Sequence, residues 1–296
     1  GTSDGEDFIK DGTVTVKVIG SATANSGFVA PAVSLSGVKI AINVVTADLT
    51  GTQTAKVSGI KVYAGQVDVV SEFNNEDEFD GLYAAEATQS VGGESDSKNF
   101  SASFSGIDIK ANTARARANT GSYAVTDGAE FDVTGSITVS SVGRAMAKAG
   151  VSTEKVSLKL IGVGVMITEA NADAVFVAEM INTSGEISAQ TLTVKSEYTA
   201  MANADTAQPA DGISVSLLDV TVNTATANVG ANGTATVSGS GIMTVKGTAS
   251  ITVTGNIYAD AEITVARSIS GVKIAVNYTN AVLKATQEAS LGLLGK

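Results

Sequence analysis

Apolar and polar residues alternate one by one along most of this chain. In residues 251–265 every odd-numbered position is apolar or glycine, and the positions between hold threonine, asparagine, tyrosine or an acidic residue. Residues 137–151 alternate in the same way, with Arg144 and Lys148 on the polar side. A period of two over this length is typical of a β-strand with one buried face. The pattern therefore predicts an all-β fold.

Two short motifs alternate along the chain and indicate an internal repeat. The first is Gly37-Val38-Lys39-Ile40-Ala41-Ile42-Asn43, which returns as Gly271-Val272-Lys273-Ile274-Ala275-Val276-Asn277, with weaker copies at 106–109, 162–165 and 219–222. The second, of the form apolar-polar-valine, lies at 14–16, 67–69, 137–139, 192–194 and 251–253. Five copies of each motif indicate one unit stacked on itself. We therefore expect residues 1–296 to form a single elongated domain.

The spacing of the motifs predicts a parallel β-solenoid. The interval from the first motif to the second is nearly constant, at 29 to 31 residues, whereas the return interval varies from 21 to 40. A rigid interval that alternates with a variable one favours two coils per repeat, or about ten coils in five two-coil repeats. At the strand spacing of ~4.8 Å, ten coils make a rod about 45–50 Å long. An antiparallel β-sandwich is the alternative.

Side-chain size along the predicted strands indicates the cross-section. The apolar row beginning at Val139 shrinks through serine and glycine to alanine, and the rows beginning at Val16 and Val194 likewise end in alanines. This gradient predicts a wedge whose opposed sheets are closest at the alanines. After the Gly-Val motif the apolar parity changes, from Val38, Ile40 and Ile42 to Ala47 and Leu49. A change at a matching place in each repeat predicts a corner or bulge there.

Three segments interrupt or flank the repeat. The longest return interval carries a polar insertion at about 71–99, which we expect to leave the solenoid as a side loop. Residues 1–11 and 286–296 are short terminal segments. Glu76, Asp77, Glu78 and Asp80 in the insertion could supply oxygen ligands to Ca²⁺, the one cofactor that the sequence leaves open. A solvated run of charge is the favoured interpretation of the same residues.

Composition excludes much chemistry. The chain has no cysteine and no histidine, so thiolate or imidazole ligands and a Ser-His-Asp triad are absent. A net charge of −11 opposes binding to nucleic acid. The longest apolar run, 158–167, is about half of what a bilayer-spanning helix needs, so we expect no membrane insertion. Aromatic residues, which sugar-binding grooves usually present, make up only 5% of the chain.

The ends of the predicted solenoid are candidate contacts between subunits. Terminal coils expose unpaired backbone groups that another chain can match. The residues expected to form these contacts are Phe8, Ile9, Leu283, Leu291, Leu293 and Leu294.

The segment from Gly37 to Val45, together with Gly135-Ser136-Ile137-Thr138-Val139-Ser140-Ser141, resembles the repeats of large bacterial surface adhesins, the filamentous-adhesin-like and autotransporter-passenger-like proteins. The resemblance implies export, a β-solenoid stalk and no catalysis. We therefore expect a non-enzymatic extracellular or cell-surface protein that assembles end to end with itself into a fibre, sheath or stalk. Two alternatives stay open: an adhesin module that displays the 71–99 loop to a surface glycan or a host, and a polysaccharide-active β-helix enzyme.

Overall fold

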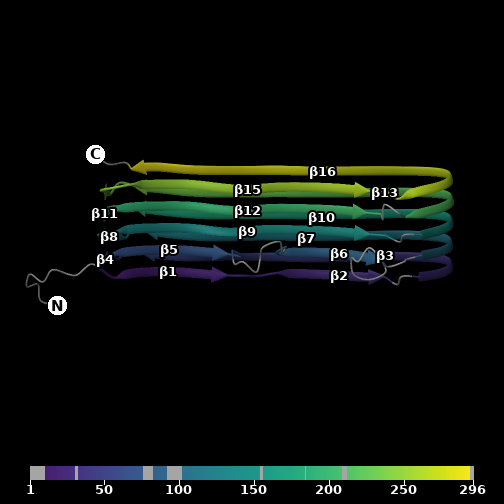
Figure 1. Ribbon diagram of the computed structural model, residues 1–296, viewed down its shortest axis with the longest axis horizontal. Helices are drawn as coiled ribbons and strands as arrows, with labels where there is room; N and C mark the ends of the chain where they lie inside the picture. The colour runs from purple at the N-terminus through teal and green to yellow at the C-terminus, as the bar shows by residue number, and fades with distance from the viewer. Residues whose placement is uncertain are drawn as a thin grey trace, which may run out of the picture.

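Five flat coils, stacked one on another, make up the protein (Figure 1). The computed structural model describes residues 11–30, 33–75, 83–91, 102–153, 156–183, 185–208 and 212–293. Helices are absent from these ranges, in which all regular secondary structure is β-strand. The chain climbs from the first coil to the fifth along one axis, and the strands lie across that axis.

Two broad sheets face each other, and a narrow third sheet joins them at one end. Sheet A contains β1 (Thr13–Gly20), β5 (Gln66–Phe73), β9 (Ser136–Ser152), β12 (Thr191–Ala207) and β15 (Ala249–Thr264), with β2 (Ala24–Ala30) and β6 (Ala85–Val91) as further strands. Sheet B contains β3 (Val33–Ser58), β7 (Ala102–Asp127), β10 (Val156–Asn182), β13 (Ile213–Gly239) and β16 (Arg267–Leu293). Sheet C contains β4 (Lys61–Ala64), β8 (Glu130–Val133), β11 (Glu186–Ala189) and β14 (Ile242–Val245).

Neighbouring strands are parallel, and equivalent residues lie side by side. Val38 of β3 pairs with Ile107 of β7, which in turn pairs with Ile161 of β10. The second motif lies in the opposite sheet, where Val67 of β5 pairs with Ile137 of β9. The parallel β-solenoid and its fivefold repeat are therefore confirmed, and the antiparallel sandwich is wrong.

Each repeat forms one coil, so the described chain has five coils and the prediction of ten is wrong. The reason is that a strand of sheet B, after a bend near its start, crosses the whole width of the coil without a further turn. Strand β10 alone has 27 residues, which at about 3.3 Å per residue is roughly 90 Å. Five coils at a spacing of ~4.8 Å stack to only about 20–25 Å. The expected rod is therefore a wide, low slab.

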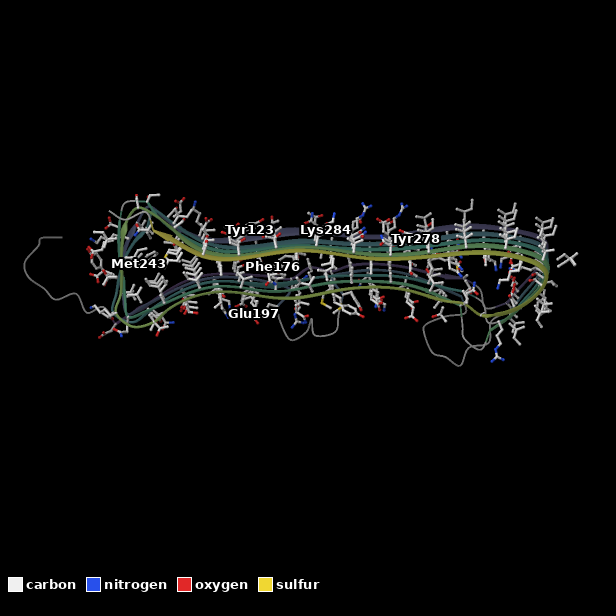
Figure 2. The ribbon with its side chains drawn as sticks, turned by 90° about the horizontal axis from the view of Figure 1, so that it is seen from above. Tyr123, Phe176, Glu197, Met243, Tyr278 and Lys284 are labelled. Atoms are coloured by element: carbon white, nitrogen blue, oxygen red, sulfur yellow. The ribbon has the colours of Figure 1, made fainter. Side chains whose placement is uncertain are left out.

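The interior changes from bulky to small side chains along the strands. Beside sheet C the core holds residues such as Phe131, Ile137 and Val194, all nearly inaccessible to solvent. Farther along sheets A and B alanines replace them, among them Ala147 and Ala202. The two sheets are farthest apart at the sheet C end, near Met243, and converge toward the middle of the slab (Figure 2). This wedge is the cross-section that the size gradient predicts.

Aromatic rings occupy the narrow part of the interior only where glycine makes room. Phe176 of β10 and Tyr198 of β12 stack with ring centroids 5.6 Å apart and planes at 4°. A Cβ atom at Gly143 would meet the Phe176 ring, and one at Gly233 would meet the Tyr198 ring. The glycines in these strands therefore let two alanine-lined sheets accept large side chains.

Part of the segment predicted as a polar loop belongs to sheet A. Strand β6 pairs with β2 on one side and with β9 on the other, and its Ala85 and Ala87 are fully buried. Before it, the buried Asn74 accepts a hydrogen bond from Ala22 N at 2.8 Å and donates one to Ala22 O at 3.2 Å. The loop prediction for 71–99 is thus wrong for 71–73, which end β5, and for 85–91, where alternating small apolar residues resume the strand pattern in β6. Residues 76–82 and 92–101 lie outside the described ranges. The terminal segment predicted at 286–296 is also wrong for 286–293, which continue β16, while residues 294–296 lie outside the described ranges.

Candidate functional site

The residues predicted to bind calcium cannot be placed. Glu76, Asp77, Glu78 and Asp80 lie outside the described residues, and within the described ranges no group of three or more His, Cys, Asp or Glu side chains could hold a metal ion. The calcium site therefore stays a prediction.

Of the predicted contact residues, the structure describes the side chains of two. Phe8, Ile9 and Leu294 lie outside the described residues, and of Leu293 only the backbone, in β16, is described. Leu283 and Leu291 are both in β16, the outer strand of the fifth coil. Their side chains are 51% and 60% exposed.

Leu283 and Leu291 point into the solenoid, yet no coil of the described residues covers them. Leu283 pairs with Val229 of β13, and Leu291 pairs with Val237. Those two valines point inward and are 2% and 0% exposed, because β16 lies above them. The same inward positions in β16 are open to solvent at the C-terminal end of the stack. This end of the slab is therefore an uncapped section through the core.

The two ends of the stack expose long unpaired strand edges. Among the described strands, β16 pairs only with β13, and at the opposite end β3 pairs only with β7. The two strands have 27 and 26 residues. The inward residues of β3 are better covered than those of β16, since Val45, Leu49 and Val57 are only 5%, 8% and 6% exposed. Exposed core side chains are therefore found at the β16 end of the stack, whereas both ends have a strand edge without a described partner.

At the end of the slab opposite sheet C, the usual distribution of polar and apolar residues is inverted. The alternation of inward and outward side chains continues without interruption from Val38 to Ser58 in β3. Inward positions here are polar, such as Lys39 and Asn43, while outward positions such as Ile40 and Ile42 are apolar and 67% and 74% exposed. The corner predicted between Ile42 and Ala47 is therefore wrong, because the residue chemistry changes there and the backbone does not.

The bend of the chain lies before Val38 instead. In sheet B the pairing omits one residue in every coil, Gly37 and its equivalents Gly106, Leu160, Leu217 and Gly271. Leu160 and the next residue, Ile161, are both exposed, at 63% and 38%. Two consecutive outward side chains are what an extra residue at a bulge produces. This bulge turns the chain from sheet A into sheet B at the right-hand end of Figure 1.

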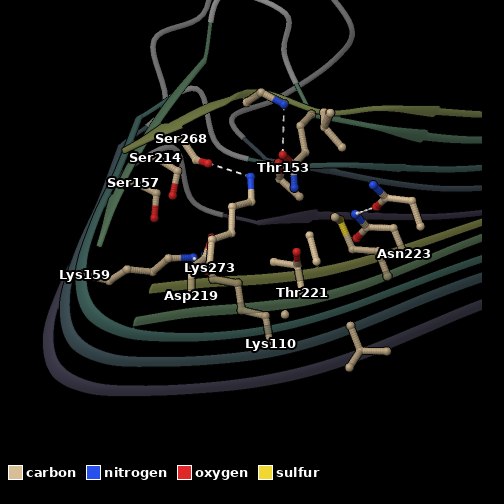
Figure 3. A pocket seen from close by; sticks show the side chains of 18 of the residues that line it. Lys110, Thr153, Ser157, Lys159, Ser214, Asp219, Thr221, Asn223, Ser268 and Lys273 are labelled. Atoms are coloured by element: carbon tan, nitrogen blue, oxygen red, sulfur yellow. Dashed lines mark hydrogen bonds and ion pairs between the residues drawn. The ribbon is translucent and has the colours of Figure 1, made fainter. Parts of the chain in front are cut away.

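The inward side chains of this end line a polar cavity of about 110 Å³ (Figure 3). Its lining includes Lys110, Lys159 and Lys273 with Asp219 and Asn223. Lys159 Nζ lies 3.0 Å from Asp219 Oδ1, and Lys110 Nζ lies 2.9 Å from Asp108 Oδ2. Both aspartates are almost completely buried, at 3% and 2% exposed. The cavity therefore holds charges inside the coil by pairing them.

Serine and asparagine columns complete the polar lining. Lys273 Nζ donates to Ser268 Oγ at 2.6 Å, and Asn223 Nδ2 donates to Asn277 Oδ1 at 2.8 Å. Among the buried atoms of this region that lack a protein partner are Asn223 Oδ1 and Ser214 Oγ, and Asp219 Oδ1 accepts no aligned hydrogen bond despite its ion pair. Water molecules or a small polar solute would satisfy such atoms.

The sequence contained a signal for this inverted end. Equivalent inward positions in the five coils read Lys39, Asp108, Gly162, Asp219 and Lys273. Charges of opposite sign at one position of a repeat indicate stacked ion pairs. The apolar residues of the motif are more regular than the polar ones between them, so the repeat is easier to recognise than the charge pattern.

Comparison with known proteins finds no relative. The chain matches no protein-family model, no curated protein and no solved structure. No helix in the described ranges is long and apolar enough to span a membrane.

Proposed function

We propose that this chain is a non-catalytic structural subunit that polymerises end to end, with the last coil of one copy stacked on the first coil of the next. The observation that carries this proposal is the uncapped β16, an edge strand of 27 residues whose inward Leu283 and Leu291 are exposed. Burial of apolar surface and pairing of free backbone groups both favour the addition of another coil.

The residues of the two end strands support pairing in register. Continued at the same offset, β16 would place Leu283 beside Leu49 and Leu291 beside Val57 of the next copy. Asn277 would lie beside Asn43, as Asn223 already lies beside Asn277 within one copy. In sheet A, Ala259 of β15 would lie beside Ala24, which continues a column of alanines. The near-identical motifs of the first and last coils thus match each other across the joint.

The adhesin-like repeats support an extracellular or cell-surface location for this polymer. They resemble stalk-forming proteins that act through their shape. Protease treatment of intact cells, followed by detection of the protein, would test this location.

The test of polymerisation uses electron microscopy and sedimentation of purified protein. We expect fibres of wild-type protein above a critical concentration. The variant Leu283→Lys with Leu291→Lys should stay monomeric, because two ammonium groups that are solvated in the monomer would be buried at the joint. The control, Thr286→Lys with Ser290→Lys, places the same charges at outward positions of the same strand and should still polymerise.

Two results would contradict the proposal. One is wild-type protein that remains monomeric at every concentration. The other is fibre formation by the Leu283→Lys and Leu291→Lys variant, which would show that these ends do not meet.

A further inference from the structure

Outward aliphatic side chains form a flat surface on sheet B, beside the bend. We call this surface the apolar bend face. It consists of three columns that cross all five coils: Val38, Ile107, Ile161, Leu218 and Val272; Ile40, Ile109, Val163, Val220 and Ile274; and Ile42, Ala111, Val165, Val222 and Val276. Columns of side chains made only of carbon project from this part of the slab in Figure 2.

The apolar bend face is large for a surface exposed to water. In the outer coils Val38, Ile42 and Ile274 are 60%, 74% and 54% exposed, and in the second coil Ile107 and Ile109 are 36% and 38% exposed. Three columns about 7 Å apart over five coils about 4.8 Å apart give a footprint of roughly 500 Å². A patch of this size equals the largest apolar patch on most soluble monomers, and such patches are often functional.

The side chains of this face cannot be buried by a local rearrangement. The inward positions of the same strand segments hold the ion pairs of Lys110 with Asp108 and of Lys159 with Asp219. A register shift of one residue would exchange the two faces and expel these charges from their partners. The apolar bend face is therefore covered from outside or not at all.

We propose that a second copy of this chain covers the apolar bend face, so that two stacks of coils pair side by side. The inference rests on the proposed end-to-end polymer. Each added copy lengthens the face by five coils, so a fibre carries a continuous apolar stripe that repeats at every coil. Another stack of the same chain presents a stripe of the same width and the same period of ~4.8 Å, which allows columns to interlock along the whole length.

Charge favours the same occupant. All three columns consist of uncharged residues, whereas the chain as a whole has a net charge of −11. Charged residues begin at the margin of the face, where Arg115 Nε lies 3.2 Å from Glu169 Oε2. Two acidic chains can approach through this face with the least contact between like charges. A membrane with anionic lipids would instead repel the rest of the slab.

The footprint predicts that pairing depends on stacking. A stable interface between proteins buries about 800 Å² on each partner, which exceeds the footprint of a single copy. Two isolated subunits should therefore pair weakly, whereas stacks of several copies should pair firmly because every copy adds its own contact area. We expect paired stacks as soon as fibres form.

The test replaces two central residues of the face in coils that do not form the fibre ends. In Ile109→Lys with Val220→Lys, the lysines lie on β7 and β13, so the edges of β3 and β16 are unchanged. The matched control is Asn119→Lys with Asn232→Lys, which adds the same charges at outward positions of the same two strands outside the face. Circular dichroism and thermal unfolding establish that both variants fold.

The readouts are fibre width and mass per length by electron microscopy. Wild type and control should form paired fibres, and Ile109→Lys with Val220→Lys should form single stacks with half the mass per length and the same coil spacing. Wild-type fibres made of single stacks, or paired fibres in the face variant, would overturn the lateral pairing while leaving the end-to-end polymer intact.

A separate measurement covers the case in which no fibres form and the end-to-end proposal fails. Sedimentation equilibrium at rising protein concentration should then show a weak dimer that is lost in the face variant, and a monomer at every concentration contradicts the pairing.

Phosphatidylcholine vesicles test whether a lipid surface, and not a second copy, covers the apolar bend face. Co-sedimentation of wild-type protein with these vesicles, abolished in the face variant and without paired stacks, would identify lipid as the partner and overturn the proposal.

Discussion

Lys39 and Lys273 occupy the same inward position in the first and the last coil, and each lies next to an aspartate of the neighbouring coil. Lys39 pairs in the ladder with Asp108, and Lys273 pairs with Asp219. Each ammonium also donates a hydrogen bond to a serine at the bend, Lys39 to Ser34 at 2.8 Å and Lys273 to Ser268 at 2.6 Å. Within one molecule each lysine thus lies beside an aspartate, whereas an end-to-end joint would bring the two lysines together.

We predict that added salt promotes polymerisation and that Lys273 accounts for part of this effect. Ions screen the repulsion between Lys273 and Lys39 of the next copy, since the screening length falls to about 10 Å at 0.1 M salt. The variant Lys273→Gln should polymerise at a lower critical concentration in dilute buffer and respond less to sodium chloride, as measured by light scattering. The control Lys284→Gln removes the same charge from an outward position of β16. Equal salt responses in Lys273→Gln and wild type would show that the lysines do not meet.

Gly143 of β9 leaves room for the Phe176 ring, so we predict that Gly143→Ala destabilises the fold. The new methyl group would meet that ring and the carbonyl oxygen of Phe73. Overpacking of this kind costs about 1–3 kcal/mol in the free energy of unfolding, which denaturant titration measures. Gly150→Ala on the same strand is the control, because its nearest neighbour within 4 Å would be Thr88 Cγ2 at an ordinary 3.7 Å. A loss of stability equal in both variants would contradict the packing argument.

We predict that the effects of replacing Lys159 and Asp219 on the stability of the fold are strongly coupled. Removing the carboxylate in Asp219→Asn leaves the Lys159 ammonium, whose side chain is only 13% exposed, without its counter-charge. Breaking a buried pair in this way costs about 3–5 kcal/mol, whereas replacing both partners by apolar residues is often nearly neutral. We therefore expect Lys159→Met with Asp219→Leu to be more stable than Asp219→Asn in chemical denaturation. The opposite order would show that solvent in the cavity supports the lone lysine.

Asp205 of β12 gives the fold a specific dependence on pH. Burial raises the pKa of its carboxyl group above the ordinary value of 3.8, and repulsion from Glu262 and Asp260 adds to this, while Lys148 opposes it. The folded protein therefore holds this proton more tightly than the unfolded chain, and stability falls as the pH rises through the folded pKa.

The variant Asp205→Asn tests this relation. We expect it to be more stable than wild type at neutral pH, where the carboxylate of the wild type is charged. The difference should close as the pH drops below 3.8, as followed by thermal unfolding across the pH range. A difference that grows toward acid pH would contradict the direction of the pKa shift.

Strand content, parallel stacking and the fivefold repeat could be predicted from the sequence because they depend on short-range alternation and on exact repetition. Ile137 and Leu192, for example, begin the same motif in two coils and pair with each other in neighbouring strands of sheet A. The number of coils could not be predicted. Alternation shows that a strand continues, but it does not show where a chain turns, and the constant interval of about 30 residues is one long strand together with its turn.

The inverted end shows a second limit of pattern analysis. The parity change between Ile42 and Ala47 is visible in the sequence, and a bulge explains it as well as a change of chemistry does. Only the uninterrupted pairing of β3 with β7 decides between them. The structure shows Leu283 and Leu291 exposed, while their role as contacts between subunits stays a prediction. The ion pairs of Asp108 and Asp219 could not be predicted. The partner of Asp219, Lys159, lies in another strand, and the sequence does not show that Asp108 and its partner Lys110 both point inward.

The long strands of sheet B have a consequence for how the chain reaches its structure. Each strand pairs with one at least 54 residues away, as Ile107 does with Ile161, so no hairpin can form early and guide the next step. A coil can therefore fold only against a neighbouring coil that is already folded. Folding that depends on contacts so distant in the sequence is slow. The fifth coil folds against the upper edge of the fourth coil, and it then exposes an edge of the same form to solvent. In the proposed polymer, folding of one molecule and growth of the fibre would therefore be the same templated event, and refolding at high concentration should compete directly with binding to a neighbouring copy.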